Sequence, residues 1–498
     1  MGCRENDLAR VVPVLERRAA GAGVCTGGVH RDRFMDCPTR KCQTREMGRS
    51  PKQPNRQLAD LMAETTVSRK GLARRIVDRG AAVGVGLAYD HTSVARWLAG
   101  EQPNAPGPAL IAEVLTELLG RRITAEDCGM TACDPADIGL EFPLSLSEAT
   151  AAVTALWRSD VEHRKFLQNS SYAVAVYPAA SMRWLTLPGP ERPMSTTGYR
   201  RIGDGDVDAL RTMTSSFVDL DNRVGGGRVR STVVHYLHTA VAPMLQSSFT
   251  EAVGRRLYAT AAELTKLAGW AAYDTEDHGL AQRYLIQALR LARAAGDTGL
   301  SAEILSAMSH QATYVGRAGD AVDLARAAQI AARTAGSPKL EAGCLMVEAH
   351  GHAARADRSA CGTTLAAAER AFDREGKVPG WLTYLDTAYM SAKTAHCFRD
   401  LGDNKRAAEL ALKSLNMSDG YQRGRTFNLC LLASSVASED PTEAVRIGDK
   451  ALELADGVAS RRTGAYLREL CAHLAPHAGM PEVTDFRRRA MAYSAKAR

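Results

Sequence analysis

Apolar residues recur at helical intervals in four short segments between residues 55 and 119. Each segment places its apolar side chains on one face, and Asn55 and Ser68 stand where helix N-caps are expected. The third segment, His91–Pro103, reads HTSVARWLAGEQP. Its Gly100 can adopt the positive φ of a helix C-terminus, and its proline blocks continuation. The pattern predicts a compact domain of small helices at residues 51–130.

The third of these helices has two faces of different chemistry. One face is apolar and consists of Val94, Trp97 and Leu98. Thr92 and Arg96 point the opposite way, with Ser93 beside them, because successive residues are rotated by about 100°. Arginine can donate two hydrogen bonds to guanine, and hydroxyl groups can reach base edges or phosphates. The outward face is therefore suited to contacts in the major groove of DNA.

The helix before it carries an excess of basic side chains. They are Arg69, Lys70, Arg74, Arg75 and Arg79, against one acidic residue, Asp78. A run of charge on a helix is usually a solvated face, but next to a candidate recognition helix it can also bind phosphates. We expect Thr92, Ser93 and Arg96 to lie near bases. We expect phosphate contacts from Arg69, Lys70, Arg74 and Arg75.

Together these segments resemble a known family. The pattern SRKGLARRI, TSVARWLAGEQP and PALIAEVLTELLGRRITAEDCGM looks like the helix-turn-helix of the Cro/repressor-like class. It resembles in particular a group of actinobacterial regulators that join such a domain to tetratricopeptide-like repeats and control differentiation and secondary metabolism. The resemblance covers roughly Pro51 to the C-terminus, and WLAGEQP is its most specific part. One departure is the connection from Arg79 to Asp90, which exceeds the usual turn of about 3–4 residues.

Residues 131–250 have a mixed pattern. Ser147–Leu167 is amphipathic with a helical period, whereas Tyr172–Leu187 alternates and predicts a short strand or hairpin, limited in length by Pro178. Gly225-Gly226-Gly227 lacks the order of a phosphate-binding loop, so we interpret it as a loop between helices. This region is predicted to be a helical linker with, at most, one short strand.

From residue 251 to 498 the chain repeats pairs of Ala-rich helical segments. The small polar turns within the pairs fall at Asp277, Asp320, Arg358, Asp403 and Asp440, with gaps of 43, 38, 45 and 37 residues. These gaps bracket 40, above the tetratricopeptide period of 34. Because one pair cannot bury its own apolar face, neighbouring pairs must stack into a superhelix with a concave groove. The predicted fold class is all-α, a helix-turn-helix domain followed by an α-solenoid of tetratricopeptide-like pairs.

A groove of this kind commonly binds a ligand. We expect a peptide, a small molecule or a protein partner there, although the pattern does not identify the residues that line it. No arginine cluster, aromatic cage or metal-binding set stands out, and Arg461–Arg462 reads as a solvated helix end.

Net charge does not help to assign function. The chain of 498 residues carries +7, but residues 1–54 hold 11 basic against 6 acidic residues, and the remainder holds 52 against 50. Residues 1–50 have weak periodicity and contain Cys3, Cys25, Cys37 and Cys42. Their spacings lack the close CxxC pairs of zinc sites, so a disordered tail, or sequence upstream of a native start near Met47, is the preferred interpretation.

Several classes of protein are disfavoured. The sequence has no nucleophile elbow, P-loop, HExxH motif or paired-cysteine metal site, so we predict no enzyme activity and no catalytic, metal-binding or cofactor-binding residues. It has no run of about 18 apolar residues and no signal-peptide core, which favours the cytoplasm with reduced thiols.

Two functions remain. The first is a transcriptional regulator that binds double-stranded DNA as a homodimer, since one such domain binds weakly. The alternative is a helical-repeat scaffold for protein interactions in which the N-terminal helices only cap the array.

Overall fold

The computed structural model describes residues 53–82, 87–103, 107–121, 123–130, 138–162, 170–189, 191–195 and 200–496. The predictions for residues 1–50, including the four cysteines there, lie outside these residues. The fold is all-helical, as predicted. Within the described ranges, extended pairing is limited to isolated bridges, Ser195 with Phe249 and Arg201 with Ser248.

The N-terminal domain consists of four helices around one small core. They are α2 (Arg56–Thr65), α3 (Arg69–Ala82), α4 (His91–Leu98) and α5 (Gly107–Leu119). The predicted caps are present: Asn55 Oδ1 accepts from Leu58 N at 3.0 Å, and Ser68 Oγ accepts from Gly71 N at 3.1 Å. Asn55 Nδ2 also donates to Cys128 O at 2.9 Å, which joins the first helix to the end of the domain.

The connection between α3 and α4 differs from the prediction. Helix α3 continues through the buried Gly80 to Ala82, so the connection comprises residues 83–90 rather than starting at residue 80. Glycine lowers helix propensity, but here it lies on the buried side of α3, where packing outweighs propensity. The connection is still longer than the usual helix-turn-helix turn.

The middle region is helical where a strand was predicted. Its helices are α6 (Leu146–Glu162), α8 (Val176–Thr186), α9 (Asp204–Val224), α10 (Gly226–Tyr236), a π-helical turn (Leu237–Val241) and α11 (Ala242–Leu245). The prediction of a strand or hairpin at Tyr172–Leu187 is wrong. Its buried residues follow the helical intervals Tyr177, Ala180, Ser181 and Trp184. Pro178 lies in the first turn of α8, where no backbone N–H is needed.

The glycine triplet is a junction and not a loop. Gly225 alone links α9 to α10, with φ +83°, and the other two glycines belong to α10. A Cβ at Gly226 would lie 2.7 Å from the Cα of Ala271. Gly227 N donates to Ala459 O at 2.9 Å. The triplet therefore allows α10 to approach two distant parts of the chain closely.

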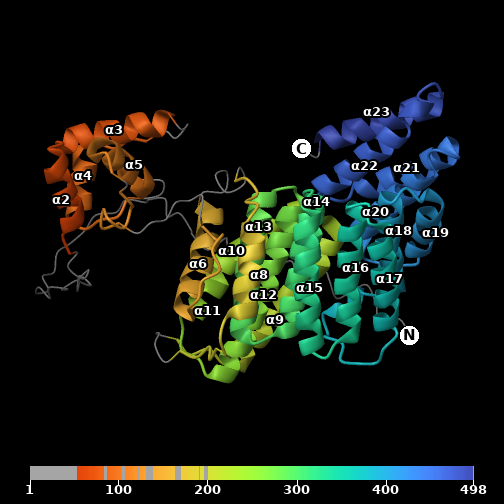
Figure 1. The fold of residues 1–498 in the computed structure, drawn as a ribbon, viewed down its shortest axis with the longest axis horizontal. Coiled ribbons are helices and arrows are strands. Elements are labelled where there is room, and N and C mark those ends of the chain that lie inside the picture. The colour runs from red at the N-terminus through yellow and green to blue at the C-terminus, as the bar shows by residue number, and fades with distance from the viewer. Residues whose placement is uncertain are drawn as a thin grey trace, which may run out of the picture. The chain divides into compact units, whose positions relative to one another are not determined.

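Six consecutive helix pairs form the repeat array in the described residues. The pairs are α12 (Glu251–Asp274) with α13 (His278–Ala295), α14 (Thr298–Tyr314) with α15 (Ala318–Thr334), α16 (Pro338–Ala354) with α17 (Arg358–Phe372), α18 (Thr387–Asp400) with α19 (Asn404–Ser414), α20 (Gln422–Val436) with α21 (Pro441–Ala455), and α22 (Arg461–His473) with α23 (Pro481–Lys496). Successive pairs stack side by side (Figure 1).

The repeat is more regular than the sequence suggested. The second helices of the first three pairs begin at residues 278, 318 and 358, which are 40 residues apart. The predicted turn at Gly319-Asp320 lies inside α15, because the actual turn uses Gly316 at φ +78°. The main irregularity is the long connection between α17 and α18, which contains a short 3-10 helix (Leu382–Tyr384).

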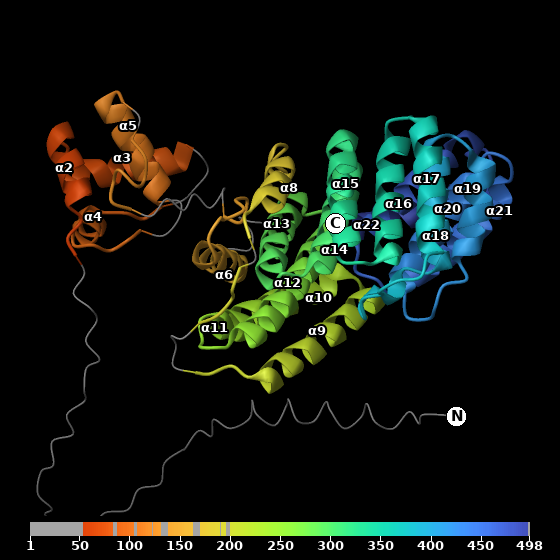
Figure 2. The same cartoon turned by 60° about the horizontal axis from the view of Figure 1, so that its bottom comes forward.

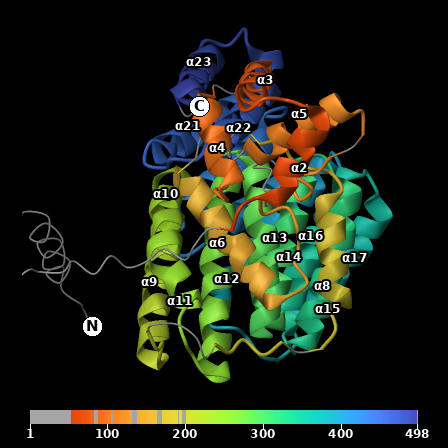
Figure 3. The same cartoon turned by 90° about the vertical axis from the view of Figure 1, so that its left-hand side faces the viewer.

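The beginning of the array is tied to its later pairs. Helices α9, α10 and α12 pack together (Figure 3), and α9 also contacts α20 (Figure 2). Ala459 N, just before α22, donates to Val224 O at the end of α9 at 2.8 Å. The helix pairs thus curve until the two ends of the stack meet. Within the described residues, no helix is both long enough and apolar enough to cross a membrane.

Candidate functional site

The candidate recognition helix α4 is fixed by its own cap and by its buried face. Asp90 Oδ1 accepts from Thr92 N at 3.0 Å and from Ser93 N at 2.9 Å, which forms a capping box. Hydrogen bonds from the Thr92 hydroxyl and from Ser93 N keep the pKa of Asp90 well below its ordinary value. Val94 and Trp97 are buried in the domain core, and Gly100 has φ +93°. Helix α4 is therefore held at both ends and along one side.

The structure brings two of the three predicted base-contacting residues to the surface of α4. Thr92 and Arg96 are exposed, and the Arg96 side chain keeps 63% of its surface accessible. The nearest carboxylate oxygen to Arg96 Nε belongs to Glu101, at 3.9 Å. Ser93, however, is only 4% exposed, and its Oγ donates to Asp90. We therefore remove Ser93 from the candidate contacts, because its hydroxyl stabilises the helix end.

The four predicted phosphate-binding residues, Arg69, Lys70, Arg74 and Arg75, are all exposed on α3. Arg74 is loosely paired with Asp78, with 3.8 Å between Nε and Oδ2, whereas Arg79 pairs with Glu117 of α5. Residues 54–130 as a whole carry nine basic and nine acidic side chains. Any attraction to phosphates must therefore come from this local cluster.

A second candidate site is a cavity of about 580 Å³ inside the repeat array. It is lined by the first helices of successive pairs, by α9 and by the connection before α18. Nine of the chain's 28 aromatic side chains line it, although the lining comprises only 39 residues. They are Trp270, Tyr273, Tyr314, Trp381, Tyr384, Tyr389, Tyr421, Phe427 and Tyr466.

The repeat itself places a row of rings along this cavity. Trp270, His310 and His350 are 40 residues apart and occupy successive first helices, and His396 follows on α18. Neighbouring ring centroids in this row are separated by 5.7, 6.3 and 5.9 Å. The spacing of one helix pair therefore becomes the spacing between neighbouring rings.

Arg462 is buried among aromatic rings at the end of this row. Its guanidinium lies 4.3 Å from the ring centroid of Tyr273 and 4.7 Å from that of Phe427. Only 4% of the residue is exposed, so the interpretation of Arg461–Arg462 as a solvated end is wrong for Arg462. The physical reason is that α22 presents this side chain to the cavity, where aromatic faces attract the cation.

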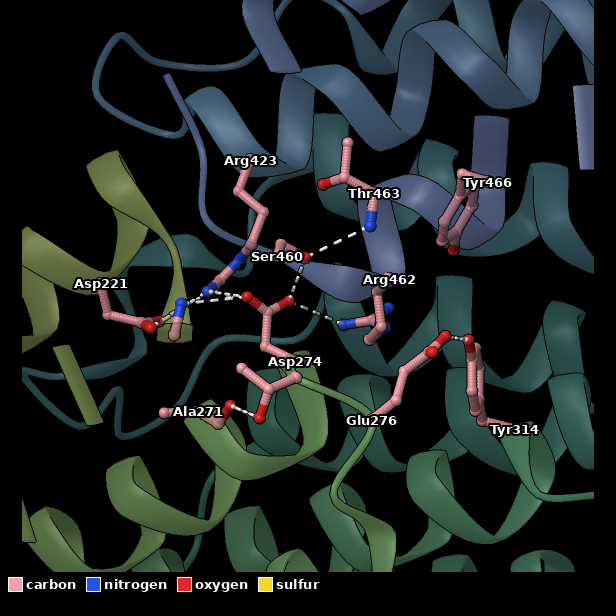
Figure 4. Close-up of polar contacts among 12 residues, drawn as sticks. Asp221, Ala271, Asp274, Glu276, Tyr314, Arg423, Ser460, Arg462, Thr463 and Tyr466 are labelled. Carbon is pink, nitrogen blue, oxygen red and sulfur yellow. Dashed lines mark hydrogen bonds and ion pairs between the residues drawn. The ribbon is translucent and has the colours of Figure 1, made fainter. Parts of the chain in front are cut away.

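A buried acidic side chain holds this corner together. Asp274, at the end of α12, accepts from Gly226 N at 3.0 Å, from Ser460 Oγ at 2.9 Å and from Arg423 Nη1 at 3.3 Å (Figure 4). Arg423 also pairs with Asp221 of α9 at 2.8 Å. Arg462 Nη1 lies 3.9 Å from Asp274. Two aspartates and two arginines from α9, α12, α20 and α22 thus balance one another's charge.

Burial and positive neighbours shift the titration of the ring row. Burial lowers the pKa of His310 and His396 well below the ordinary value, and Lys393, Arg399 and Arg462 lower them further. Burial followed by the charge of Arg462 lowers the pKa of Lys393 to about 7. The imidazoles are therefore neutral at neutral pH, and Lys393 Nζ can donate to His310 Nδ1 at 3.1 Å.

The sequence analysis missed the cavity because its residues are spread from Val218 to Glu469. The 40-residue recurrence of Trp270, His310 and His350 was a signal that could have found it. Among the described residues no cluster of three or more His, Cys, Asp or Glu side chains is arranged to hold a metal ion. The cavity is chemically a binding site with aromatic walls and a few charged groups.

One comparison with known proteins gives a match. Residues 58–131 match the family model described as the SP15 N-terminal domain. The match covers α2–α5 and ends before the repeat array, so it does not extend to the cavity. No curated protein matches the chain. The N-terminal domain is therefore similar to the SP15 N-terminal domain, and the resemblance to Cro/repressor-like regulators with tetratricopeptide-like repeats stays a prediction.

Proposed function

We propose that the protein is a transcriptional regulator that binds double-stranded DNA through α4 of its N-terminal domain. In this proposal the repeat array binds a ligand or partner and joins two copies of the chain. The observation that carries the proposal is the exposed Thr92/Arg96 face on a short helix that is capped by Asp90 and anchored by Trp97.

The chemistry of this face supports base recognition. Arg96 is exposed and only weakly paired, so its guanidinium can form the two parallel hydrogen bonds that identify guanine. The Thr92 hydroxyl donates to Asp90 Oδ1 at 2.7 Å and keeps its lone pairs for a donor on DNA. Rigid support matters because a recognition side chain must be held in place before binding.

The basic cluster on α3 supports contacts with the DNA backbone. Arg69, Lys70, Arg74 and Arg75 can neutralise phosphates wherever α3 faces the duplex. Because the domain is neutral overall, one copy offers few such contacts and binds weakly. A homodimer with two recognition helices would supply the missing affinity.

The test starts with the full chain and fragmented genomic DNA. Bound fragments are recovered and sequenced to find a preferred site, and affinities for that site and for unrelated DNA are then measured by electrophoretic shift. We expect Arg96→Ala to weaken binding to the preferred site about 5- to 150-fold and to leave binding to unrelated DNA almost unchanged. Arg446→Ala, on an exposed surface of α21, serves as the matched control.

The double variant Arg74→Ala/Arg75→Ala should behave differently. It should weaken binding to all sequences and lower the slope of log affinity against log salt by about 2. If the wild type binds every sequence equally weakly, and Arg96→Ala changes nothing, the protein is not a specific regulator. The scaffold function would then be favoured.

A further inference from the structure

The size of the cavity in the repeat array fits a small molecule. Its volume of about 580 Å³ lies within the range of pockets that enclose most of a drug-sized ligand, roughly 300–1,000 Å³. Seven helices and the connection before α18 contribute to its walls. A cavity with walls on so many sides suits one compact ligand better than an extended chain.

The walls select an aromatic ligand. The nine aromatic side chains and the row from Trp270 to His396 present ring faces and edges to the cavity. The connection between α17 and α18, which interrupts the repeat, adds Trp381 and Tyr384 to the wall. Flat apolar rings bind most favourably between such faces, in stacked or edge-to-face arrangements.

The charges around the cavity leave one cation without an acidic partner. Arg423 pairs with Asp221, Lys266 with Glu303, and Arg399 with Asp400. Lys393 has no ion pair with a carboxylate in the part of the chain that the structure describes. Its ammonium faces His310 Nδ1 at 3.1 Å and lies over the ring of Tyr389. A half-buried ammonium in these surroundings favours an anion beside it.

Unpaired polar atoms lie in the same corner. Tyr273 Oη, His350 Nδ1 and Arg462 Nε are buried, and each lacks a hydrogen-bond partner among the described residues. Two of these can donate to an oxyanion, because an arginine Nε and a tyrosine hydroxyl both carry a proton. Buried polar groups without partners are uncommon in folded proteins, so several in one cavity indicate a ligand that satisfies them.

We propose that this cavity binds a small aromatic acid, with its rings between the aromatic walls and its anionic group beside Lys393 and Arg462. The ligand class rests on the proposed function in that it would be the effector of the regulator. Its binding can nevertheless be measured without DNA.

The experiment uses the full chain and a matched pair of fluorescent probes. The first is 8-anilinonaphthalene-1-sulfonate, which has an aromatic body and one negative charge. The second is N-phenyl-1-naphthylamine, which has the same rings without the charge. We expect the sulfonate to bind at one saturable site per chain and at least about tenfold more tightly than the neutral probe. Equal affinity for both probes, or no saturable binding, would overturn the proposal.

Lys393→Gln tests the anion contact. It should weaken binding of the sulfonate about tenfold and leave the neutral probe almost unaffected, whereas Lys450→Gln, on an exposed surface of α21, should change neither. Circular dichroism checks that each variant is folded, because partly folded proteins also bind the sulfonate probe. Phe427→Ala provides a second variant, and it should weaken both probes because it removes part of the wall. Unchanged sulfonate binding in Lys393→Gln contradicts the proposal.

The dependence on pH sharpens this test. Groups facing Lys393 are His310 and Glu303 of α14, His350 of α16, Arg462 of α22, and His396 and Cys397 of its own helix. The sulfonate keeps its charge at all pH values used, while Lys393 loses its proton above about pH 7. Affinity should therefore fall from pH 6 to pH 8.5 in the wild type and change little in Lys393→Gln. An unchanged slope in the variant would assign the effect to another group and overturn the role of Lys393.

Competition identifies the ligand class. Anthracene-9-carboxylate should displace the sulfonate probe, and its neutral analogue 9-anthracenemethanol should not. Displacement by short peptides, and not by the aromatic carboxylate, would overturn the proposal in favour of a peptide. Probe binding that persists in a chain without specific DNA binding refutes the proposed function alone. Specific DNA binding without probe binding refutes this inference alone.

Discussion

The two candidate sites differ in how their polar groups are held. On α4 and α3 the candidate side chains are exposed and only loosely paired, and the surrounding domain stabilises only their helices. In the repeat array the charged groups are buried, and each helps to hold distant helices together. The exposed site can change its residues at little cost to folding. The buried site cannot, because its charges stabilise the fold as well as line the cavity.

The largest effect should come from removing Arg423. The change Arg423→Ala leaves Asp221 and Asp274 buried without their main partner, and breaking such a pair costs about 3–5 kcal/mol of the free energy of unfolding. Urea unfolding followed by circular dichroism measures the loss. Arg446→Ala breaks an exposed pair with Glu443 and should change stability by no more than about 1 kcal/mol. Similar losses in both variants would remove the contrast between the buried and exposed sites.

The second effect concerns pH. Lys393, His310 and His396 have lowered pKa values in the folded state, so the unfolded chain binds more protons between the folded and unfolded pKa values. The array should therefore lose stability as the pH falls from 8 to 5.5, by roughly 2 kcal/mol after allowance for partial exposure and for carboxyl groups with raised pKa. Lys393→Met should flatten the part of this loss between pH 8 and 7.

The N-terminal domain should respond in a different pH range. The pKa of Asp90 is lowered, so its stabilising effect is complete above the ordinary carboxyl range and is lost only as the pH falls below it. The fluorescence difference between wild type and Trp97→Phe reports this domain during urea unfolding. Equal losses in both regions between pH 8 and 5.5 would contradict the assignment of the sensitivity to the ring row.

The smallest effect should come from Ser93→Ala. The change removes a buried hydroxyl that donates to Asp90, so we expect a loss of about 1 kcal/mol from the N-terminal domain. Relative affinity for preferred and unrelated DNA should stay the same, because the hydroxyl faces the cap and not the surface. A change in base preference with unchanged stability would return Ser93 to the recognition face.

Local patterns were sufficient to predict much of the fold. The caps at Asn55, Ser68 and Asp90, the buried face with Trp97 and the stacked helix pairs all depend on neighbours within a few residues. The strand predicted at Tyr172–Leu187 failed because alternation over a short apolar segment also fits a buried helix. Ser93 failed because position on a helical wheel does not reveal use in a cap.

The cavity was beyond such patterns because it depends on which distant segments meet. Arg462 reads as a polar residue at a helix start, and only its position over Tyr273 and Phe427 makes it part of a binding site. The recurrence at Trp270, His310 and His350 is visible in the sequence, but its meaning depends on the 40-residue pair. Contacts between α9 and α20 span about 200 positions, which no local period encodes.

The tie between α9 and the later helix pairs limits how this array can evolve. Open repeat proteins commonly gain or lose units, because each unit contacts only its neighbours. Here one added or deleted pair would shift Arg423 and Ala459 away from α9, so that Asp221 and Val224 lose their partners. The number of pairs is therefore fixed by the closure. Descendants of this protein should vary by substitution within the pairs and by changes in the connection before α18, and not by repeat number.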